Sequence, residues 1–532
     1  MSFLQFNFWL FLCILILAYY FLPKKFQWIC LLCGSYVFYL FTGIKTIGYI
    51  LFTTLSVWSG AVLITKINEQ KENELIKNKE TLTPEVKKNI KAKAKKKQKI
   101  IFLCVLLINF GILGFLKYFN FIAENITWLF NVSTGNKIEP IMLGLLLPLG
   151  ISFYTFQSIG YLIDVYNGKY KAEKNLLKFA LFVSFFPQIV QGPINRFDTL
   201  ANQLYEPHKF NLKKFEYGLQ LILLGLFKKM IIADRAIAVV NEVFNHYDKY
   251  GGGIVIFGIL FYSLQQYTDF SGGIDVATGI AELLGINMSI NFKRPYFSIS
   301  LSEFWRRWHI TLGSWMRDYI FYPLALTKKM SQIGKLSNKY IGKRAGKIIP
   351  VAISNIVVFL VVGIWHGPYW HYVVWGLYNG IIIAFSAVLE PFYIWLKRIT
   401  KVNTDCFSYY LFRILRTFFI VNLGWYFDRA DSLQVSFYML HSTIMNFNIN
   451  QLADGTILKL GLTEFDFNVL FVATIVLVVI SVMQENGIKI REFLSEQNLV
   501  FRWILLYVLI FAIIGLDASS TNLLGGFMYA QF

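Results

Sequence analysis

Charged residues are scarce in this chain of 532 residues: they make up 15% of the sequence, while hydrophobic residues make up 56%. A typical soluble domain is about one quarter charged. Apolar runs long enough to cross roughly 30 Å of hydrocarbon recur along the whole length. The composition therefore excludes an ordinary soluble domain and predicts an all-α polytopic membrane protein. We expect a single membrane domain over residues 1–532, with about eleven transmembrane helices plus re-entrant or interfacial helices.

Cysteine is also scarce. Four of the five cysteines lie in apolar runs, and no second pair or nearby histidine completes a metal set around Cys30 and Cys33. We interpret the cysteines as small buried hydrophobic residues and expect no bound metal. The sequence lacks a Walker loop, so nothing in it favours ATP-driven pumping. Residues 3–22 lack the basic start and the cleavage site of a signal peptide, so we expect them to form the first retained span.

Acidic residues (31) are fewer than basic residues (51), which gives a formal net charge of +20. The lysines gather in loops, as in the cytoplasmic segments of membrane proteins. Within residues 66–99, the stretch 87–99 holds eight lysines and no acid, and residues 327–349 hold seven basic residues and no acid. We predict that both loops are cytoplasmic, the first largely as solvated helix, and that the N-terminus lies outside. Such a face attracts anionic membrane lipids or an acidic protein partner, and no nucleic acid is expected.

Two histidines stand out from this background. His309 follows two adjacent arginines, and His366 ends an apolar run in the sequence Trp365-His-Gly367. Imidazole is the one side chain whose ordinary pKa lets it gain or lose a proton near neutral pH. A histidine at a helix break in a membrane protein indicates a functional site. The alternative is a structural role, with His309 packed beside Trp305 and His366 bonded to a freed backbone carbonyl.

The stretch 300–320 is predicted to be one amphipathic helix. Ser300 and Glu303 have the spacing of a capping box, so the helix should begin there. His309 falls on the aromatic face and the arginines fall on the opposite face. A helix of this kind lies in the membrane interface or re-enters the protein rather than spanning the bilayer. The arginines would anchor the helix to lipid phosphates or bind the phosphates of a donor molecule. The residues concerned are Trp305 and Trp308 on the first face and Arg306 and Arg307 on the second.

A set of motifs at a characteristic spacing carries a family resemblance. They are Gly150-Ile-Ser-Phe-Tyr-Thr-Phe-Gln157, Phe186-Pro-Gln188, Gly192-Pro-Ile-Asn-Arg196, Asp269-Phe-Ser-Gly272, Phe304-Trp-Arg-Arg-Trp-His309, Trp365-His-Gly367 and an aromatic terminus at Phe532. With these motifs the chain resembles the membrane-bound O-acyltransferase (MBOAT) family, and more narrowly its bacterial alginate O-acetyltransferase branch. The resemblance covers nearly the whole chain. It implies a helical bundle around a central tunnel, in which an acyl group passes from a thioester to a hydroxyl.

The resemblance also implies roles for individual residues. His366 matches the active-site histidine of the family, and His309 matches the second member of the pair. Either imidazole could take the proton from the acceptor hydroxyl. For His309 the further roles are to orient the acceptor, polarise the thioester carbonyl or protonate the leaving thiol. The expected substrate-binding residues are Arg306, Arg307, Trp305, Trp308, Trp365, Gln188 and Asp269. No tightly bound cofactor is expected, and the donor would be acetyl-CoA or an acylated carrier protein with phosphopantetheine.

These roles predict export of acetyl groups across the bacterial cytoplasmic membrane for O-acetylation of a cell-surface polysaccharide, completed by a separate extracytoplasmic SGNH-type acetyltransferase. One alternative is D-alanyl transfer from a carrier protein towards teichoic acid, although that branch usually has shorter chains. A proton-coupled transporter is a second alternative. It would need acidic residues inside spans, whereas the candidates are few and lie near predicted ends. A purely structural scaffold would not explain the paired histidines. The acidic candidates are Asp164, Asp269, Asp275 and Glu282.

Overall fold

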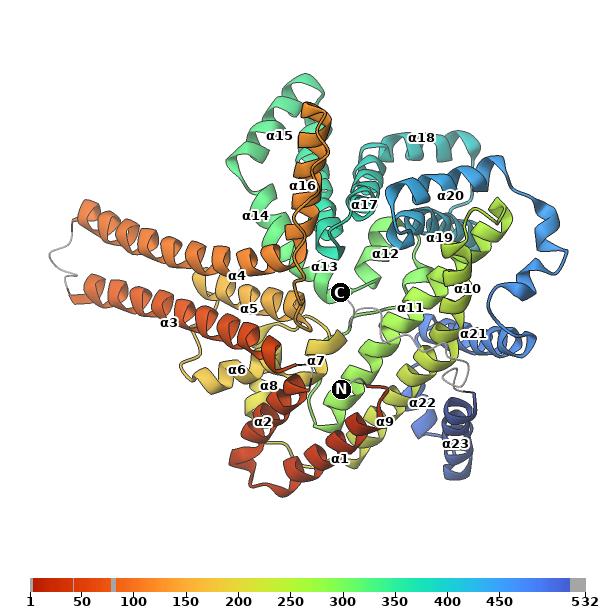
Figure 1. Ribbon diagram of the computed structural model, residues 1–532. Helices are drawn as coiled ribbons and strands as arrows, with labels where there is room; N and C mark the ends of the chain where they lie inside the picture. Colours follow the sequence, from red (N-terminus) through yellow and green to blue (C-terminus); the bar gives the residue numbers. More distant parts are fainter. Residues whose placement is uncertain (1–2, 42, 78–82, 517–532) are drawn as a thin grey trace. The chain divides into compact units, whose positions relative to one another are not determined.

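The computed structural model describes residues 3–41, 43–77 and 83–516, and all regular elements in these ranges are helical (Figure 1). The prediction of an all-α membrane protein is confirmed. The aromatic terminus at Phe532 lies outside the described residues. The chain divides into two compact units. The first contains residues 1–216 and 280–289, and the second contains residues 217–279 and 290–531.

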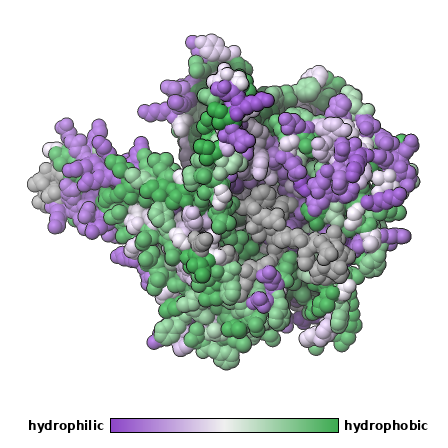
Figure 2. Space-filling model, in the orientation of Figure 1, coloured by the Kyte–Doolittle hydropathy of each residue, from purple (hydrophilic) through white to green (hydrophobic). Residues whose placement is uncertain are grey.

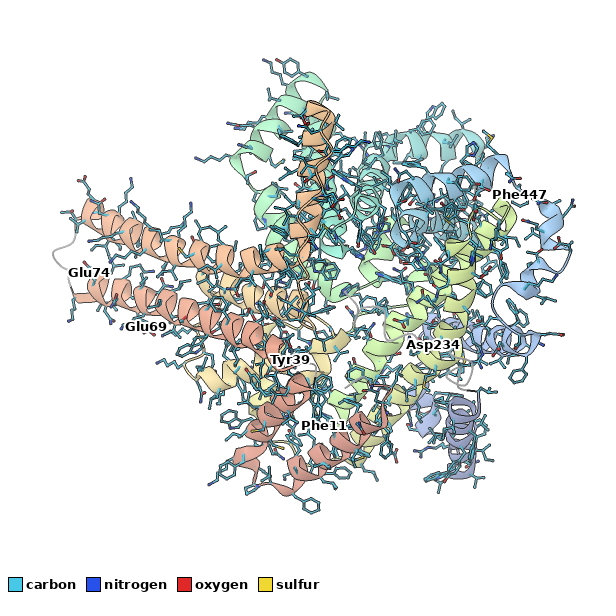
Figure 3. The ribbon with its side chains drawn as sticks, viewed as in Figure 1. Phe11, Tyr39, Glu69, Glu74, Asp234 and Phe447 are labelled. Carbon is cyan, nitrogen blue, oxygen red and sulfur yellow. The ribbon has the colours of Figure 1, made fainter. Side chains whose placement is uncertain are left out.

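The first unit begins the chain with eight helices. They are α1 (Phe6–Phe21), α2 (Gln27–Leu40), α3 (Ile47–Lys77), α4 (Pro84–Thr134), α5 (Ile151–Tyr166), α6 (Leu176–Ser184), α7 (Phe186–Gln191) and α8 (Phe197–Tyr205). Helix α9 (Leu212–Leu226) contains the first boundary between the units, and α11 (Gly252–Leu283) contains the second. Aromatic rings form much of the core of this unit. Phe11 (Figure 3), for example, lies 5.6 Å from the ring centroid of Phe186.

The second unit contains the remaining helices. After a π-helical segment (Phe227–Ala233) come α10 (Asp234–Asn245), α11, α12 (Leu301–Arg307), α13 (Ile310–Met316), a second π-helical segment (Arg317–Phe321), α14 (Tyr322–Ala325), α15 (Lys328–Tyr340), α16 (Lys343–His366), α17 (Trp370–Val388), α18 (Glu390–Thr400), α19 (Phe407–Arg429), α20 (Leu433–Met445), α21 (Glu464–Glu485), α22 (Ile490–Ser495) and α23 (Leu499–Gly515). Helices α16 and α17 pack along each other.

Among the described residues, five helices are long and apolar enough to cross a membrane: α3, α4, α16, α17 and α21. Helices α1 and α23 are apolar but shorter. The predicted total of about eleven spans stays a prediction.

Helices α3 and α4 run side by side as a two-helix arm of the first unit (Figure 1). Hydrophilic side chains gather at its outer end, which includes Glu69 and Glu74 of α3 (Figures 2 and 3). The buried Gln98 of α4 donates a hydrogen bond to the carbonyl oxygen of Ile64 in α3 (3.3 Å). All eight lysines between Lys87 and Lys99 are exposed, and none forms an ion pair with a described residue. This stretch is an exposed basic helix, and its place in the cytoplasm stays a prediction.

Helices α9 and α11 approach each other closely through glycines of the second unit. A Cβ atom at Gly225 would lie 2.5 Å from the carbonyl oxygen of Gly272, and one at Gly272 would lie 2.8 Å from that of Gly225. Because both obstacles are backbone atoms, neither can move aside as a side chain would. The last glycine of the motif Asp269-Phe-Ser-Gly272 is therefore required for helix packing.

We expect Gly272→Ala to lower the free energy of unfolding in detergent by about 1–3 kcal/mol, because the added methyl group overpacks the contact with α9. Gly111→Ala is the matched control, since nothing lies within 4 Å of a Cβ atom built at Gly111. Both changes improve helix propensity equally, so the control should be neutral or slightly stabilising. Equal melting temperatures for the two variants would contradict the role assigned to Gly272.

Candidate functional site

The helix predicted over 300–320 is interrupted at His309. Its start is as predicted, because the side-chain oxygen of Ser300 accepts a hydrogen bond from the backbone N–H of Glu303 (3.2 Å). The prediction of one continuous helix is wrong. Helix α12 ends at Arg307, and His309 takes a left-handed backbone conformation with φ 44° and ψ 52° before α13 begins.

Neighbouring backbone groups explain this break. The carbonyl oxygen of Arg307 accepts a hydrogen bond from the backbone N–H of Lys293 (2.9 Å). The backbone N–H of Ile310 donates to the carbonyl oxygen of Asn291 (2.9 Å). Groups that would bond within a continuous helix are thus bonded to the preceding loop. Helical spacing could not reveal this, because the competing partners come from residues outside the helix.

Asn291 also fixes the imidazole of His309. Its side-chain oxygen accepts hydrogen bonds from the backbone N–H and the hydroxyl of Thr311 (3.1 and 2.8 Å), and it lies 3.2 Å from Nδ1 of His309. A backbone N–H can only donate, so the Asn291 atom at this point is the oxygen. It follows that Nδ1 of His309 carries the proton, and that Nε2 carries the lone pair.

His309 is neutral over the ordinary pH range. Its side chain is 3% exposed, and the ring of Phe270 meets it edge-on at 4.9 Å. Burial, together with the neighbouring imidazole of His366, lowers the pKa of His309 to about 3. The residue is therefore a neutral ring that can accept a hydrogen bond at Nε2.

His366 is the last residue of α16. The helix stops at Gly367, whose backbone is extended, as the Gly367-Pro368 sequence predicts. The ring of His366 is 12% exposed and packs 4.6 Å from Trp375 and 5.2 Å from Trp365. Trp365 in turn lies 6.1 Å from His309. The structure therefore brings the two predicted histidines and Trp365 together from segments 57 positions apart in the sequence.

Asp428 is a site residue that the sequence reasoning missed. One of its oxygens, Oδ1, lies 3.8 Å from Nδ1 of His366. The other, Oδ2, accepts hydrogen bonds from the hydroxyl of Tyr262 (2.7 Å) and from Nε2 of Gln266 (2.8 Å). The available signal was a carboxylate directly after an apolar stretch, in Gly424-Trp-Tyr-Phe-Asp428. Asp428 was not among the acidic candidates near predicted spans, which were Asp164, Asp269, Asp275 and Glu282.

The two predicted phosphate-binding arginines differ in their surroundings. Arg307 forms ion pairs with Glu303 (2.7 Å) and Glu485 (2.9 Å), and Glu485 also pairs with Arg294 (2.5 Å). Arg307 is thus committed to linking α12 with α21. Arg306 is exposed and forms no ion pair within residues 3–41, 43–77 and 83–516. Of the pair, Arg306 is the one available to a ligand.

The predicted tryptophans of α12 line the region around the histidines. The indole N–H of Trp305 donates to the side-chain oxygen of Asn379 (3.0 Å), and its ring meets Trp375 edge-on at 5.4 Å. Trp308 is buried and stacks on Phe304 at 5.5 Å. These contacts place aromatic rings beside Trp375, which packs against His366.

Gln188 and Asp269 have partners of their own. In the first unit, Gln188 donates to the carbonyl oxygen of Phe182 (2.8 Å) and accepts from the side-chain amide of Asn195 (3.2 Å). In the second unit, Asp269 pairs with the buried Lys229 (2.6 Å), which also pairs with Asp234 of α10 (2.7 Å; Figure 3). These contacts account for both side chains in the structure, and their role in substrate binding stays a prediction. Within the described chain, no cluster of three or more His, Cys, Asp or Glu residues could hold a metal ion.

Breaking the Asn291 contacts should loosen the turn at His309. We expect Asn291→Ala to cost about 1–3 kcal/mol of stability, because it leaves buried donors of Thr311 and His309 without an acceptor. Asn287→Ala, in the same loop but exposed, should change stability by less than about 0.5 kcal/mol. Thermal unfolding of the two purified variants makes the comparison. Equal unfolding temperatures would show that Asn291 does not hold the turn.

Comparisons with known proteins agree with the motifs. A sequence model of the membrane-bound O-acyltransferase family matches residues 173–337. The chain is 31% identical over 478 residues to the probable alginate O-acetylase AlgI of Azotobacter vinelandii, which covers 89% of this chain and 83% of that protein. It is 36% identical over 331 residues to the probable alginate O-acetylase AlgI of Pseudomonas syringae pv. tomato, covering 62% of this chain and 58% of that protein.

A more distant similarity bears on the alternative function. The chain is 30% identical over 279 residues to the teichoic acid D-alanyltransferase of Streptococcus thermophilus, covering 51% of this chain and 63% of that protein. The alignment with the Azotobacter protein covers a larger share of this chain and of its relative than the streptococcal alignment does.

Proposed function

Because this chain belongs to the membrane-bound O-acyltransferase family, we propose that it transfers an acetyl group from a cytoplasmic thioester across the membrane to a hydroxyl acceptor, for O-acetylation of a cell-surface polysaccharide. The observation that carries the proposal is the meeting of His309 and His366 at Trp365. The names of the two alginate O-acetylase relatives support an acetyl donor and a polysaccharide acceptor.

In this proposal His366 is the general base. An alcohol is a poor nucleophile until its proton is removed. His366 takes the proton of the acceptor hydroxyl while that oxygen attacks the thioester carbonyl. The new C–O bond replaces the C–S bond, and the proton passes from His366 to the departing thiolate. The buried carboxylate of Asp428 beside Nδ1 favours the charged imidazolium between these two steps.

The tautomer of His309 selects among the roles that the sequence left open. Polarising a carbonyl or protonating a thiol needs an N–H, but the proton on Nδ1 is committed to Asn291. The lone pair of Nε2 can instead accept a hydrogen bond from the acceptor hydroxyl. We therefore assign His309 to orienting the acceptor, and Trp305, Trp308 and Trp365 to lining the site.

Helix α15 supports a negatively charged donor. Four of its lysines are exposed, and it packs against α16, which ends at His366. Both CoA and the phosphopantetheine of a carrier protein carry phosphate, and a basic surface raises the local concentration of such molecules. Arg306 is the further cation that we assign to the donor. The lysines are Lys328, Lys329, Lys335 and Lys339.

The remaining features follow from the same proposal. The whole chain acts as one membrane domain in the bacterial cytoplasmic membrane, with the N-terminus outside and with α15 and the basic part of α4 in the cytoplasm. A separate extracytoplasmic SGNH-type acetyltransferase completes the polymer modification. D-alanyl transfer towards teichoic acid is the second candidate, supported by the streptococcal relative. Offering purified protein acetyl-CoA, an acetylated carrier and a D-alanylated carrier in turn separates the candidates.

The central test is His366→Ala in proteoliposomes supplied with a labelled acetyl thioester. Loss of the base should lower kcat by about 10²–10⁴-fold. His441→Ala is the matched control, because His441 is exposed, and its turnover should equal that of the wild type. Thioester consumption and label on the acceptor are measured together. Normal turnover by His366→Ala would refute the proposed function.

Replacing Lys328, Lys329 and Lys335 together by glutamine should raise the KM for the donor by on the order of tenfold with little change in kcat, since these side chains attract the donor but do not touch the reacting atoms. The difference from wild type should shrink as ionic strength rises, because salt screens exposed charges. Initial rates against donor concentration at low and high salt give both values. A KM that stays at the wild-type value at low salt would exclude α15 as the donor surface.

A further inference from the structure

The surroundings of Asp428 suggest more than a packing role. Its side chain is 3% exposed at the end of α19. A buried carboxylate is costly unless it is paired and hydrogen-bonded. Its hydrogen-bond donors among the described residues, Tyr262 and Gln266, both come from α11 and bond to the same oxygen, Oδ2. Oδ1 accepts no hydrogen bond from the part of the chain that the structure describes.

No lysine or arginine of the described residues neutralises the carboxylate of Asp428. The adjacent Arg429 turns away, pairing with Asp431 (3.4 Å) and donating to the side chain of Asn241 (2.9 Å). Within the described ranges, no lysine or arginine forms an ion pair with Asp428. Among the described residues, the basic side chain within 4 Å of Asp428 is the imidazole of His366. A carboxylate whose one oxygen is anchored and whose other oxygen faces a histidine is arranged to act on that histidine.

We propose that Asp428 is a positioning residue for His366, which holds the proton of the imidazole on Nδ1 and stabilises the imidazolium formed during acyl transfer. This inference rests on the proposed function. With the proton on Nδ1 facing Asp428, the lone pair of Nε2 is the one that takes the hydroxyl proton. Burial raises the pKa of Asp428 to about 6, so its carboxylate is ionised near neutral pH. The proton continues from His366 to the leaving thiolate. The distance of 3.8 Å between Oδ1 of Asp428 and Nδ1 of His366 shortens to that of a hydrogen bond when the imidazole becomes charged.

Apart from Arg429 and its partner Asp431, the groups near the pair are neutral. Tyr372 of α17 lies 5.9 Å from the ring of His366, and Tyr262 is bonded to Oδ2. His309 is neutral, as its hydrogen bond to Asn291 and its burial require. Arg429 is the nearby fixed cation, and it opposes rather than favours a charged His366. Asp428 is thus the group that can stabilise the imidazolium.

The test is Asp428→Asn, which keeps the shape of the side chain and removes its charge. We expect kcat to fall by about 10²–10⁴-fold, with the KM for the acetyl donor unchanged within about twofold. The acid limb of the kcat/KM profile should move to lower pH, because an imidazolium without its carboxylate loses its proton more readily. Asp428→Glu, which restores the charge, should recover part of kcat and return the acid limb towards its wild-type position.

Asp431→Asn is the matched control, since the same substitution is made three residues away at an exposed side chain. It should leave kcat and the pH profile unchanged. A folded Asp428→Asn protein with wild-type kcat and acid limb would overturn the inference. So would a loss of kcat with an unmoved acid limb and no recovery in Asp428→Glu, because a packing defect alone behaves in that way.

If Asp428→Asn does not fold, Tyr262→Phe decides the question. This variant keeps the charge and frees Oδ2 from one of its two donors, so kcat should fall by about tenfold with the fold retained. Wild-type kcat in Tyr262→Phe would then overturn the inference. Failure of the proposed function is recognised separately: the wild-type protein would consume no acyl thioester, or His366→Ala would consume it at the wild-type rate. Loss of activity in His366→Ala with full activity in Asp428→Asn would remove only the role of Asp428.

Discussion

The site depends on the hydrogen bonds that the side-chain oxygen of Asn291 accepts. This oxygen accepts hydrogen bonds from the backbone N–H and the hydroxyl of Thr311 and from Nδ1 of His309. It therefore fixes both the backbone turn and the ring of His309. The left-handed backbone at His309 costs energy for a residue with a Cβ atom, of the order of 1–3 kcal/mol. That cost is offset because the same oxygen satisfies groups that would otherwise be buried without partners. Backbone strain, tautomer and ring orientation are therefore set by one acceptor.

The sequence was most informative where a local rule was sufficient. The cap at Ser300 and the helix end at Gly367 depend on neighbouring residues, and both are found as predicted. The break at His309 could not be foreseen, because the competing hydrogen bonds come from Asn291 and Lys293, which no spacing rule connects to the helix. Asp428 was missed for a related reason. Its significance appears only when α11 and α19 are placed beside α16.

Several buried charged side chains in the described part of this protein form ion pairs. Lys229 joins two aspartates, and Arg235 bonds to Asp466 at 3.0 Å. Such pairs contribute little net stability, but removing one member leaves an uncompensated charge and is expensive. They consequently fix which helices can neighbour each other. The glycine contact between α9 and α11 acts in the same direction, since it holds the helix that carries Tyr262 and Gln266.

Helix α4 has 51 residues without interruption. At 1.5 Å per residue its path is about 76 Å long, but the helix turns partway along its length (Figure 1). The part before the turn carries the exposed lysines of residues 87–99, and it is regular helix rather than a loop. A molecule that binds these lysines therefore meets charges already held at fixed helical spacings, so binding does not have to order a flexible segment first.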